Sequence, residues 1–410
     1  MTTQAVGAET GTRVPDEELK RNMGLDRDRC DGAYSETFDT RSLQERLSQD
    51  YVEPTDENLR DAHDQIVSFL HDNRCMLVVP MRERGPVIEP MLRHVVGLMS
   101  PQNIIVVNDN SDDPAIQAVS RYGARLIHRD DWLNMLDWPR LLDILNLTER
   151  PTRGKGVAVL AGYLYLHFWV QQTGIQPGML LQHDAEIAEY ARYRGVEHLI
   201  WGLLQRPNAS YVKMAKSGRG NERCMAARSS LPVLAASQNV APKSRQRAQD
   251  LFDKLVKHKW MLTGEFGMGF ELAMQRYFAT GYLEETCMSI QLEDWAAQHG
   301  RVTAQVGNPN PRLDGANDDR KEAIMQQQIS NFLGQMALDA PLFTEWTIET
   351  IRCLNHGVMS SPVKMGWVAP NDGPVVAEML PNDRIIPSVT QLFGAGLVDC
   401  DAAMRLLEQT

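Results

Sequence analysis

The chain has 410 residues, of which 43% are hydrophobic and 23% are charged, and this composition is typical of a folded globular protein rather than a disordered one. Its length allows two domains, or one large domain with appendages. The formal net charge of -11 disfavours a nucleic-acid-binding protein, which would need a basic surface. Small anionic substrates remain compatible with this charge, because local positive groups can hold them.

The cysteines and the apolar segments give an expectation for the cellular compartment of the protein. Six cysteines are scattered without C-x-x-C spacing, which favours reduced thiols over a disulfide framework or a zinc site. The first twenty residues contain no apolar core of the signal-peptide kind. The longest apolar run, Val157–Val170, is short for a membrane span and contains Gly162 and His167, so a buried helix is the better interpretation. We therefore expect a cytoplasmic protein without a membrane span.

Strands and helices are predicted to alternate along the first half of the chain. The predicted strands are Cys75–Pro80, Asn103–Val107, Ala124–His128, Met179–Gln182 and Ser210–Ala215. The predicted helices are Ile88–Met99, Ala115–Tyr122, Trp132–Leu147 and Lys155–Gln172. Such alternation predicts a parallel sheet with crossover helices. Further on, residues 308–319 are predicted to be loop and residues 320–347 an amphipathic helix.

Two short segments about thirty residues apart carry most of the functional information. Asp184 and Glu186 follow an apolar strand, and alternate residues of a strand point to the same side, so both carboxylates can converge on one hard cation. Magnesium or manganese is the usual partner of such a pair. Lys155, between two glycines, adds a positive charge for a diphosphate. The alternative is a solvated strand end with ordinary surface acids, and we rank it lower because ligands of open α/β sheets bind beyond the carboxyl ends of the strands.

Three other patterns give weaker or negative information. The glycines of residues 264–269 do not fit a dinucleotide-binding motif and are expected to permit close backbone approach or a tight turn; Glu265 among them is either functional or an acid at a helix N-terminus. The segment 218–223 has two arginines and can wrap an anion, although an exposed loop explains it equally well. No zinc-hydrolase histidine motif and no G-x-S-x-G elbow is found in the sequence.

In this order, the segments resemble those of glycosyltransferases of the A-type fold, in particular the retaining enzymes that make glucosyl-3-phosphoglycerate and mannosyl-3-phosphoglycerate. The resemblance covers roughly residues 75 to 315. It implies an α/β, Rossmann-like fold with a mainly parallel sheet flanked by helices, plus helical N- and C-terminal additions. It also implies a metal-dependent hexosyltransferase. Glucose or mannose would pass from a nucleotide-diphosphate sugar to a small anionic acceptor such as 3-phosphoglycerate or glycerate, with retention of anomeric configuration.

The resemblance assigns roles to individual residues. The metal ligands for Mg²⁺ or Mn²⁺ would be Asp184 and Glu186, where Glu replaces the second Asp of the family motif. The catalytic residues would be Asp184, Glu186, Glu265 and Glu285. The donor-binding residues would be Pro80, Met81, Arg82, Glu83, Asp109, Lys155 and Tyr282. The acceptor-binding residues would be Gly218, Arg219, Gly220 and Asn221.

Two departures from the family pattern accompany these assignments. The family usually has Asn-Glu after the first strand, whereas this chain has Glu83 followed by Arg84. The family also places a metal-binding histidine in a loop that corresponds to residues 308–314 here, and this loop contains none. Asn310, Asp314 or water is left as the third ligand.

Four segments are expected along the chain. Residues 1–72 form a polar, helical N-terminal extension, 73–190 the nucleotide-sugar-binding half, 191–319 the acceptor-binding half, and 320–410 a C-terminal helical extension. The last segment either contributes a homodimer contact or packs on its own domain, which is the more frequent outcome.

Two alternative functions stay open. A sugar-phosphate nucleotidyltransferase also presents paired acids, but it normally has a glycine-rich basic loop after the first strand, and Met81–Pro86 contains one glycine. A non-catalytic sugar-nucleotide-binding or scaffold protein of the same fold is the other, and the missing loop histidine gives it weight.

Overall fold

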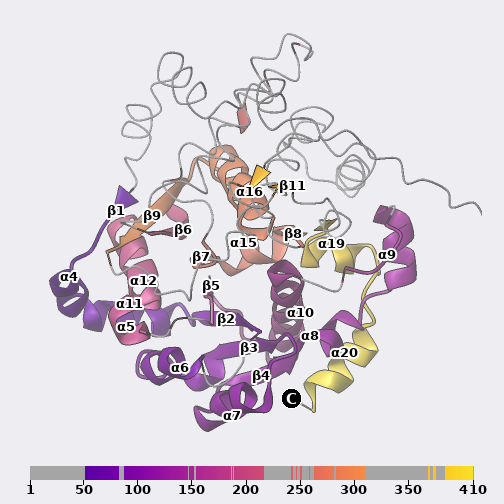
Figure 1. The fold of residues 1–410 in the computed structure, drawn as a ribbon, viewed down its shortest axis with the longest axis horizontal. Coiled ribbons are helices and arrows are strands. Elements are labelled where there is room, and N and C mark those ends of the chain that lie inside the picture. The colour runs from indigo at the N-terminus through magenta and orange to yellow at the C-terminus, as the bar shows by residue number, and fades with distance from the viewer. Residues whose placement is uncertain are drawn as a thin grey trace, which may run out of the picture.

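The computed structural model describes residues 51–82, 87–145, 147–151, 154–185, 187, 189–216, 242, 246, 250–251, 258, 263–280, 283–309, 368–369, 373–374 and 384–409. At its centre lies an eight-stranded sheet with the order β1-β9-β6-β7-β5-β2-β3-β4 (Figure 1). Its strands are β1 Tyr51–Val52, β2 Met76–Met81, β3 Ile104–Asn108, β4 Arg125–His128, β5 Met179–Gln182, β6 Ala209–Lys216, β7 Phe266–Gly269 and β9 Val302–Asn308.

The direction of the strands gives the sheet its class. Strand β7 runs antiparallel to both of its neighbours, β5 and β6, and every other pairing in this sheet is parallel. The predicted α/β class with a mainly parallel sheet is therefore confirmed. Among the described residues, two short antiparallel pairs lie outside it: β8 Phe278–Ala279 with β12 Ile385–Ile386, and β10 Val368–Ala369 with β11 Gly373–Pro374.

Helices flank the sheet and create a core on each of its faces. Side chains of β2 alternate between the two, with Met76 and Val78 in one hydrophobic cluster and Leu77 and Val79 in the other. The helices, in chain order, are α4 Asp56–Asp61, α5 His63–Asp72, α6 Glu89–Val95, the short η2 Pro101–Asn103, α7 Asp113–Arg121, α8 Arg129–Leu133, α9 Trp138–Leu145, α10 Lys155–Thr173, α11 Tyr190–Tyr193, α12 Gly195–Gln205, α15 Phe270–Gln275, α16 Glu284–Gln298, α19 Val389–Gly394 and α20 Cys400–Leu407.

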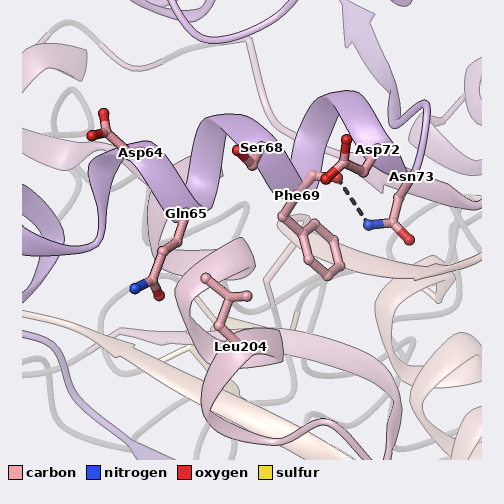
Figure 2. A pocket seen from close by; sticks show the side chains of 7 residues that line it. All are labelled: Asp64, Gln65, Ser68, Phe69, Asp72, Asn73 and Leu204. Atoms are coloured by element: carbon pink, nitrogen blue, oxygen red, sulfur yellow. Dashed lines mark hydrogen bonds between the residues drawn. The ribbon is translucent and has the colours of Figure 1, made fainter.

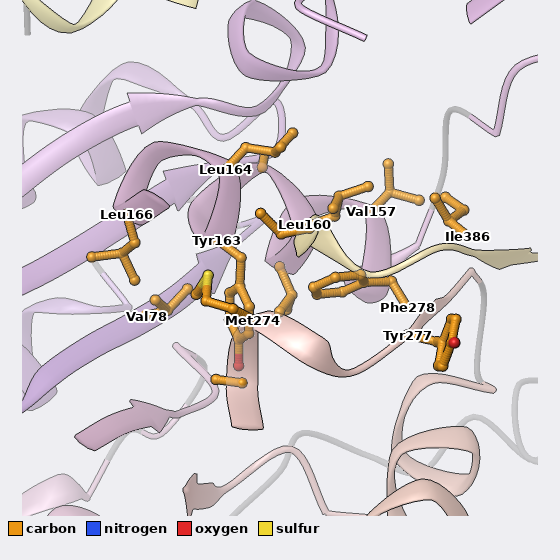
Figure 3. Packing of buried hydrophobic residues seen from close by; sticks show 14 of the residues in the cluster. Val78, Val157, Leu160, Tyr163, Leu164, Leu166, Met274, Tyr277, Phe278 and Ile386 are labelled. Atoms are coloured by element: carbon orange, nitrogen blue, oxygen red, sulfur yellow. The ribbon is translucent and has the colours of Figure 1, made fainter. Parts of the chain in front are cut away.

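Helix α10 is the central element of the first core. It is buried over most of its circumference, as a helix with apolar residues on all sides should be, and the sequence prediction of its extent is confirmed within one residue. Gly162 allows it to approach the sheet, since a Cβ there would lie 2.8 Å from the side chain of Val78. Figure 3 shows Leu160 and Tyr163 of α10 among their neighbours in this cluster, which include Phe278 and Ile386.

The structure differs from the sequence prediction in several elements. The helix predicted over Ile88–Met99 is shorter and ends at Val95. The helix predicted over Trp132–Leu147 is two helices, α8 and α9, because Pro139 fits only the first turn of a helix and forces a new start. Strands β1, β7 and β9 of the sheet were not predicted. Because Glu265 precedes strand β7, its interpretation as an acid at a helix N-terminus is wrong. The close approach expected of the neighbouring glycines is found at Gly267, where a Cβ would lie 2.6 Å from Leu181.

Among the described residues, no helix has both the length and the hydrophobicity that crossing a membrane requires.

Candidate functional site

Several predicted site residues lie at one edge of the sheet, where the parallel strands end. Strand β5 ends at Gln182, and Asp184 follows two residues later. Because β7 is antiparallel to β5, it begins where β5 ends, and Phe266 pairs with Gln182. The residues just before β7, Gly264 and Glu265, therefore come to the same edge.

Three charged side chains meet at this edge, and we refer to Lys155, Asp184 and Glu285 as the charged cluster. The ammonium of Lys155 forms an ion pair with Asp184 Oδ1 and lies 3.3 Å from Glu285 Oε1. The side chains of Lys155, Asp184 and Glu285 are 20%, 18% and 14% exposed, so solvent still reaches each of them. Residues separated by 29 and 130 positions in the chain are thus brought together.

Helix geometry places Lys155 at this position. Gly154, with φ of 108°, occupies a backbone conformation that suits glycine, and α10 begins immediately after it.

Burial by itself would lower the pKa of Lys155. The carboxylates of Asp184, Glu285 and Glu265 outweigh burial and raise this pKa above the ordinary value for lysine. Lys155 is therefore a permanent positive charge at physiological pH.

The residues before β7 form the wall behind the cluster. A Cβ on Gly264 would lie 2.8 Å from Lys155 Cε, so the lack of a side chain makes room for the lysine. Glu265 is fully buried, and its carboxylate accepts a hydrogen bond from the hydroxyl of Thr263. The backbone oxygen of Glu265 accepts from the N–H of Met214 at 3.1 Å, which ties the wall to β6.

Gly156, the residue after Lys155, packs against backbone, and this gives a stability prediction. A Cβ at Gly156 would collide with the carbonyl of Ala279 and lie 2.7 Å from Glu284 Oε2. We expect Gly156→Ala to lower the free energy of unfolding by about 1–3 kcal/mol, as overpacking does, despite the better helix propensity of alanine. Chemical denaturation measures the change. Gly394→Ala, at a helical glycine with nothing within 4 Å, is the control. Equal stability of the two variants would contradict this packing.

A second group of predicted residues lies at the ends of β2 and β3. Pro80 and Met81 belong to β2, and Arg82 follows it with its side chain exposed. Asp109, just after β3, is 5% exposed, and its N–H donates to the carbonyl of Met81 at 2.8 Å. Its carboxylate forms an ion pair with Arg129 at the start of α8.

Sequence reasoning missed Arg129. The signal available for it was its position directly after β4, at the same edge of the sheet as Asp109.

The remaining predicted residues lie outside the described part of the chain. They are Glu83, Glu186, Gly218, Arg219, Gly220, Asn221, Tyr282, Asn310 and Asp314. Their roles stay predictions. Within the described ranges, no three His, Cys, Asp or Glu side chains are grouped so that they could hold a metal ion. Asp184 offers the carboxylate chemistry that Mg²⁺ and Mn²⁺ prefer, and it stands only two residues from the second predicted ligand, Glu186.

A surface groove of about 420 Å³ lies between α5 and α12 and contains none of the predicted site residues. Figure 2 shows its polar rim, with Asp64 and Asp72 of α5, and its apolar floor of Phe69 and Leu204. Its lining contains no basic side chain for an anionic ligand. The charged cluster is therefore the better candidate site.

Comparison with known proteins gives matches in structure. No model of a known protein family and no curated protein matches the chain. Solved structures of glucosyl-3-phosphoglycerate synthase from Mycobacterium tuberculosis are similar to it. The complex with Mn²⁺, UDP and glucosyl-3-phosphoglycerate is 20% identical, with 67% of this chain and 84% of that chain covered and a TM-score of 0.47. The complex with Mn²⁺ and UDP-glucose is 19% identical, with 70% and 86% covered and a TM-score of 0.47.

Proposed function

We propose that this protein is a metal-dependent hexosyltransferase. It would transfer glucose or mannose from a nucleotide-diphosphate sugar to a small anionic acceptor, such as 3-phosphoglycerate or glycerate, with retention of anomeric configuration. The observation that supports this proposal best is the charged cluster at the carboxyl ends of a mainly parallel sheet. Open α/β sheets bind ligands at that edge, and a lysine among carboxylates suits a diphosphate that arrives with a divalent cation.

Asp184 and Glu186 would hold the cation, Mg²⁺ or Mn²⁺. When bound, the cation neutralises charge on the diphosphate and so stabilises the leaving nucleotide. Lys155 has a raised pKa and therefore offers the diphosphate a second, permanent positive charge. Glu285 contacts the same ammonium at 3.3 Å and would lie close to the donor sugar.

The other residues of this chain would orient the two substrates. Pro80, Met81, Arg82, Glu83, Asp109 and Tyr282 are assigned to the donor. Gly218, Arg219, Gly220 and Asn221 are assigned to the acceptor, whose anionic group suits an arginine and backbone amides. Glu265 would form the wall beside the reacting sugar. Departure of the nucleotide leaves an oxocarbenium-like sugar, and the acceptor hydroxyl attacks from the same face, so positioning supplies much of the catalysis and no protein nucleophile is needed.

Other parts of the sequence interpretation belong to the same proposal. They are the division into segments 1–72, 73–190, 191–319 and 320–410, a homodimer contact in the last of these, and a location in the cytoplasm. Size-exclusion chromatography with light scattering tests the dimer.

Ligand binding tests the proposal directly. We expect one sugar nucleotide among UDP-glucose, GDP-mannose, GDP-glucose and ADP-glucose to raise the melting temperature only when Mg²⁺ or Mn²⁺ is present. At a ligand concentration of one hundred times Kd the gain in unfolding free energy is about 2.7 kcal/mol. The metal ions alone are the control. Turnover is then assayed with that donor and with 3-phosphoglycerate or glycerate.

Each outcome of this panel separates the candidate functions. Stabilisation by a nucleoside triphosphate and a sugar phosphate, but by no sugar nucleotide, would favour a nucleotidyltransferase. Binding of a sugar nucleotide without hydrolysis or transfer would favour a non-catalytic binding protein. No response to any nucleotide would refute the proposed function.

A further inference from the structure

Arg276 is a buried cation close to the charged cluster. Arg276, directly after α15, is 2% exposed and forms an ion pair with Glu284 at 2.6 Å. Its guanidinium lies 4.5 Å from the ring centre of Phe278 and 4.8 Å from that of Tyr163, two residues labelled in Figure 3. Removing an ion pair from water carries a large desolvation cost, and apolar replacements are often at least as stable. Stability alone is therefore a weak reason for this pair.

On one side, the pair supports the two helix starts that carry Lys155 and Glu285. Glu284 Oε2 accepts the N–H of Ala279 at 2.9 Å, and Gly156 packs against this same carboxylate oxygen and against the carbonyl of Ala279. Gly156 follows Lys155 in α10, and Glu285 follows Glu284 in α16. A displacement of the Glu284 carboxylate would therefore shift both ends of the Lys155–Glu285 contact.

On the other side, the pair reaches the strand that carries Asp184. Arg276 Nη2 donates to Gln182 Oε1 at 3.5 Å, and Gln182 Nε2 donates to the carbonyl of Gly264 at 3.4 Å. Gln182 is the last residue of β5, and Gly264 lies against Lys155 and Asp184. One buried ion pair thus contacts or adjoins every segment from which the charged cluster is built.

We propose that the Arg276–Glu284 ion pair is the positioning device that holds Lys155, Asp184 and Glu285 in contact. Its two members do not touch the substrates; they act through the segments that they join. The geometric part of this inference stands on the contacts alone, and its catalytic part rests on the proposed function.

The test replaces both charges at once. In Arg276→Met/Glu284→Gln, methionine keeps an apolar stem among the aromatic rings, and glutamine keeps an oxygen for the N–H of Ala279. The control is Glu197→Gln, which changes a carboxylate that is 1% exposed and whose partners are His94 and Arg194, outside the charged cluster. Circular dichroism and melting temperature establish that each variant is folded.

The first readout is the reactivity of the Lys155 amine. An N-hydroxysuccinimide ester labels lysines at a fixed pH, and peptide mass spectrometry gives the rate at Lys155. We expect the double variant to label several-fold faster at Lys155 than the wild type, because its ammonium is no longer held between carboxylates, and we expect Glu197→Gln to match the wild type. A folded double variant with wild-type labelling would overturn the inference.

The second readout is turnover of the sugar nucleotide identified by the ligand panel. We expect kcat of the double variant to fall about 100-fold, as a misplacement of about 1 Å can cause, with a smaller change in KM. In a Lys155→Met background the same substitutions should cost little more, because residues that act as a unit are not additive. A wild type that turns over no sugar nucleotide would refute the proposed function, and the labelling result would still decide this inference. An active wild type whose double variant keeps full kcat would refute the inference and leave the function standing.

Discussion

Asp184→Asn is expected to lower sugar transfer about 10²–10³-fold, the size of effect seen when one preorganised electrostatic contact to a developing charge is removed. In the proposed site, Asp184 is both a metal ligand and the ion-pair partner of Lys155. Asparagine preserves the shape of the side chain but removes its negative charge, so both roles are weakened. Alanine at this position should abolish transfer.

The fold should tolerate this change. Asparagine keeps the shape of the Asp184 side chain, and Lys155 keeps Glu285 as a partner at 3.3 Å, so the substitution leaves no unpaired buried charge. The measurements are kcat and KM with the preferred donor, together with the melting temperature with and without Mn²⁺. The wild type should gain stability from donor and metal together, and the variant should not.

Asp112→Asn is the matched control for this substitution. Asp112 also follows a parallel strand of the sheet, and its side chain caps α7 by accepting the N–H of Ala115. Asparagine caps helices about as well as aspartate, so activity and stability should both be preserved. Near-normal turnover of Asp184→Asn would remove Asp184 from the proposed metal site.

Local sequence patterns were sufficient for strands β2 to β5 and for helix α10, but not for the helix predicted over Trp132–Leu147. Strands β2, β3 and β5 are short, mostly apolar segments between polar turns, and α10 is a long, mostly apolar segment that begins directly after a glycine. Strand β7 was missed because three of the six residues from Gly264 to Gly269 are glycines, which have low strand propensity. Its identity as a strand depends on pairing with β5 and β6, which are distant in sequence.

The residues of the candidate site also differ in how far local sequence predicts them. Lys155 and Asp184 could be predicted because each stands at the end of a recognisable element. The Lys155–Glu285 contact joins residues 130 positions apart, and without the family resemblance nothing in the local sequence of Glu285 indicates it. Arg276 and Glu284 were not predicted, because a single charged residue near aromatic residues looks the same whether it is exposed or buried.

Arg276→Met alone is expected to be strongly destabilising, because it leaves Glu284 as an uncompensated buried carboxylate. Breaking a buried ion pair by removing one partner costs about 3–5 kcal/mol, whereas replacing both partners with groups of similar volume is often close to neutral. Urea denaturation should therefore show a large loss for Arg276→Met and a much smaller loss for Arg276→Met/Glu284→Gln.

The double-mutant cycle tests whether Arg276 and Glu284 stabilise the fold as a pair. If the ion pair is formed as the 2.6 Å separation indicates, the Glu284→Gln substitution should restore stability to the Arg276→Met protein, so the two effects will not add. Additive losses would mean that Arg276 and Glu284 stabilise the fold independently. The double variant can also recover stability without recovering the Lys155 contacts. This result would separate the effect of the pair on stability from its effect on the position of the charged cluster. Packing can replace a buried ion pair, but it does not impose the same geometry on neighbouring segments.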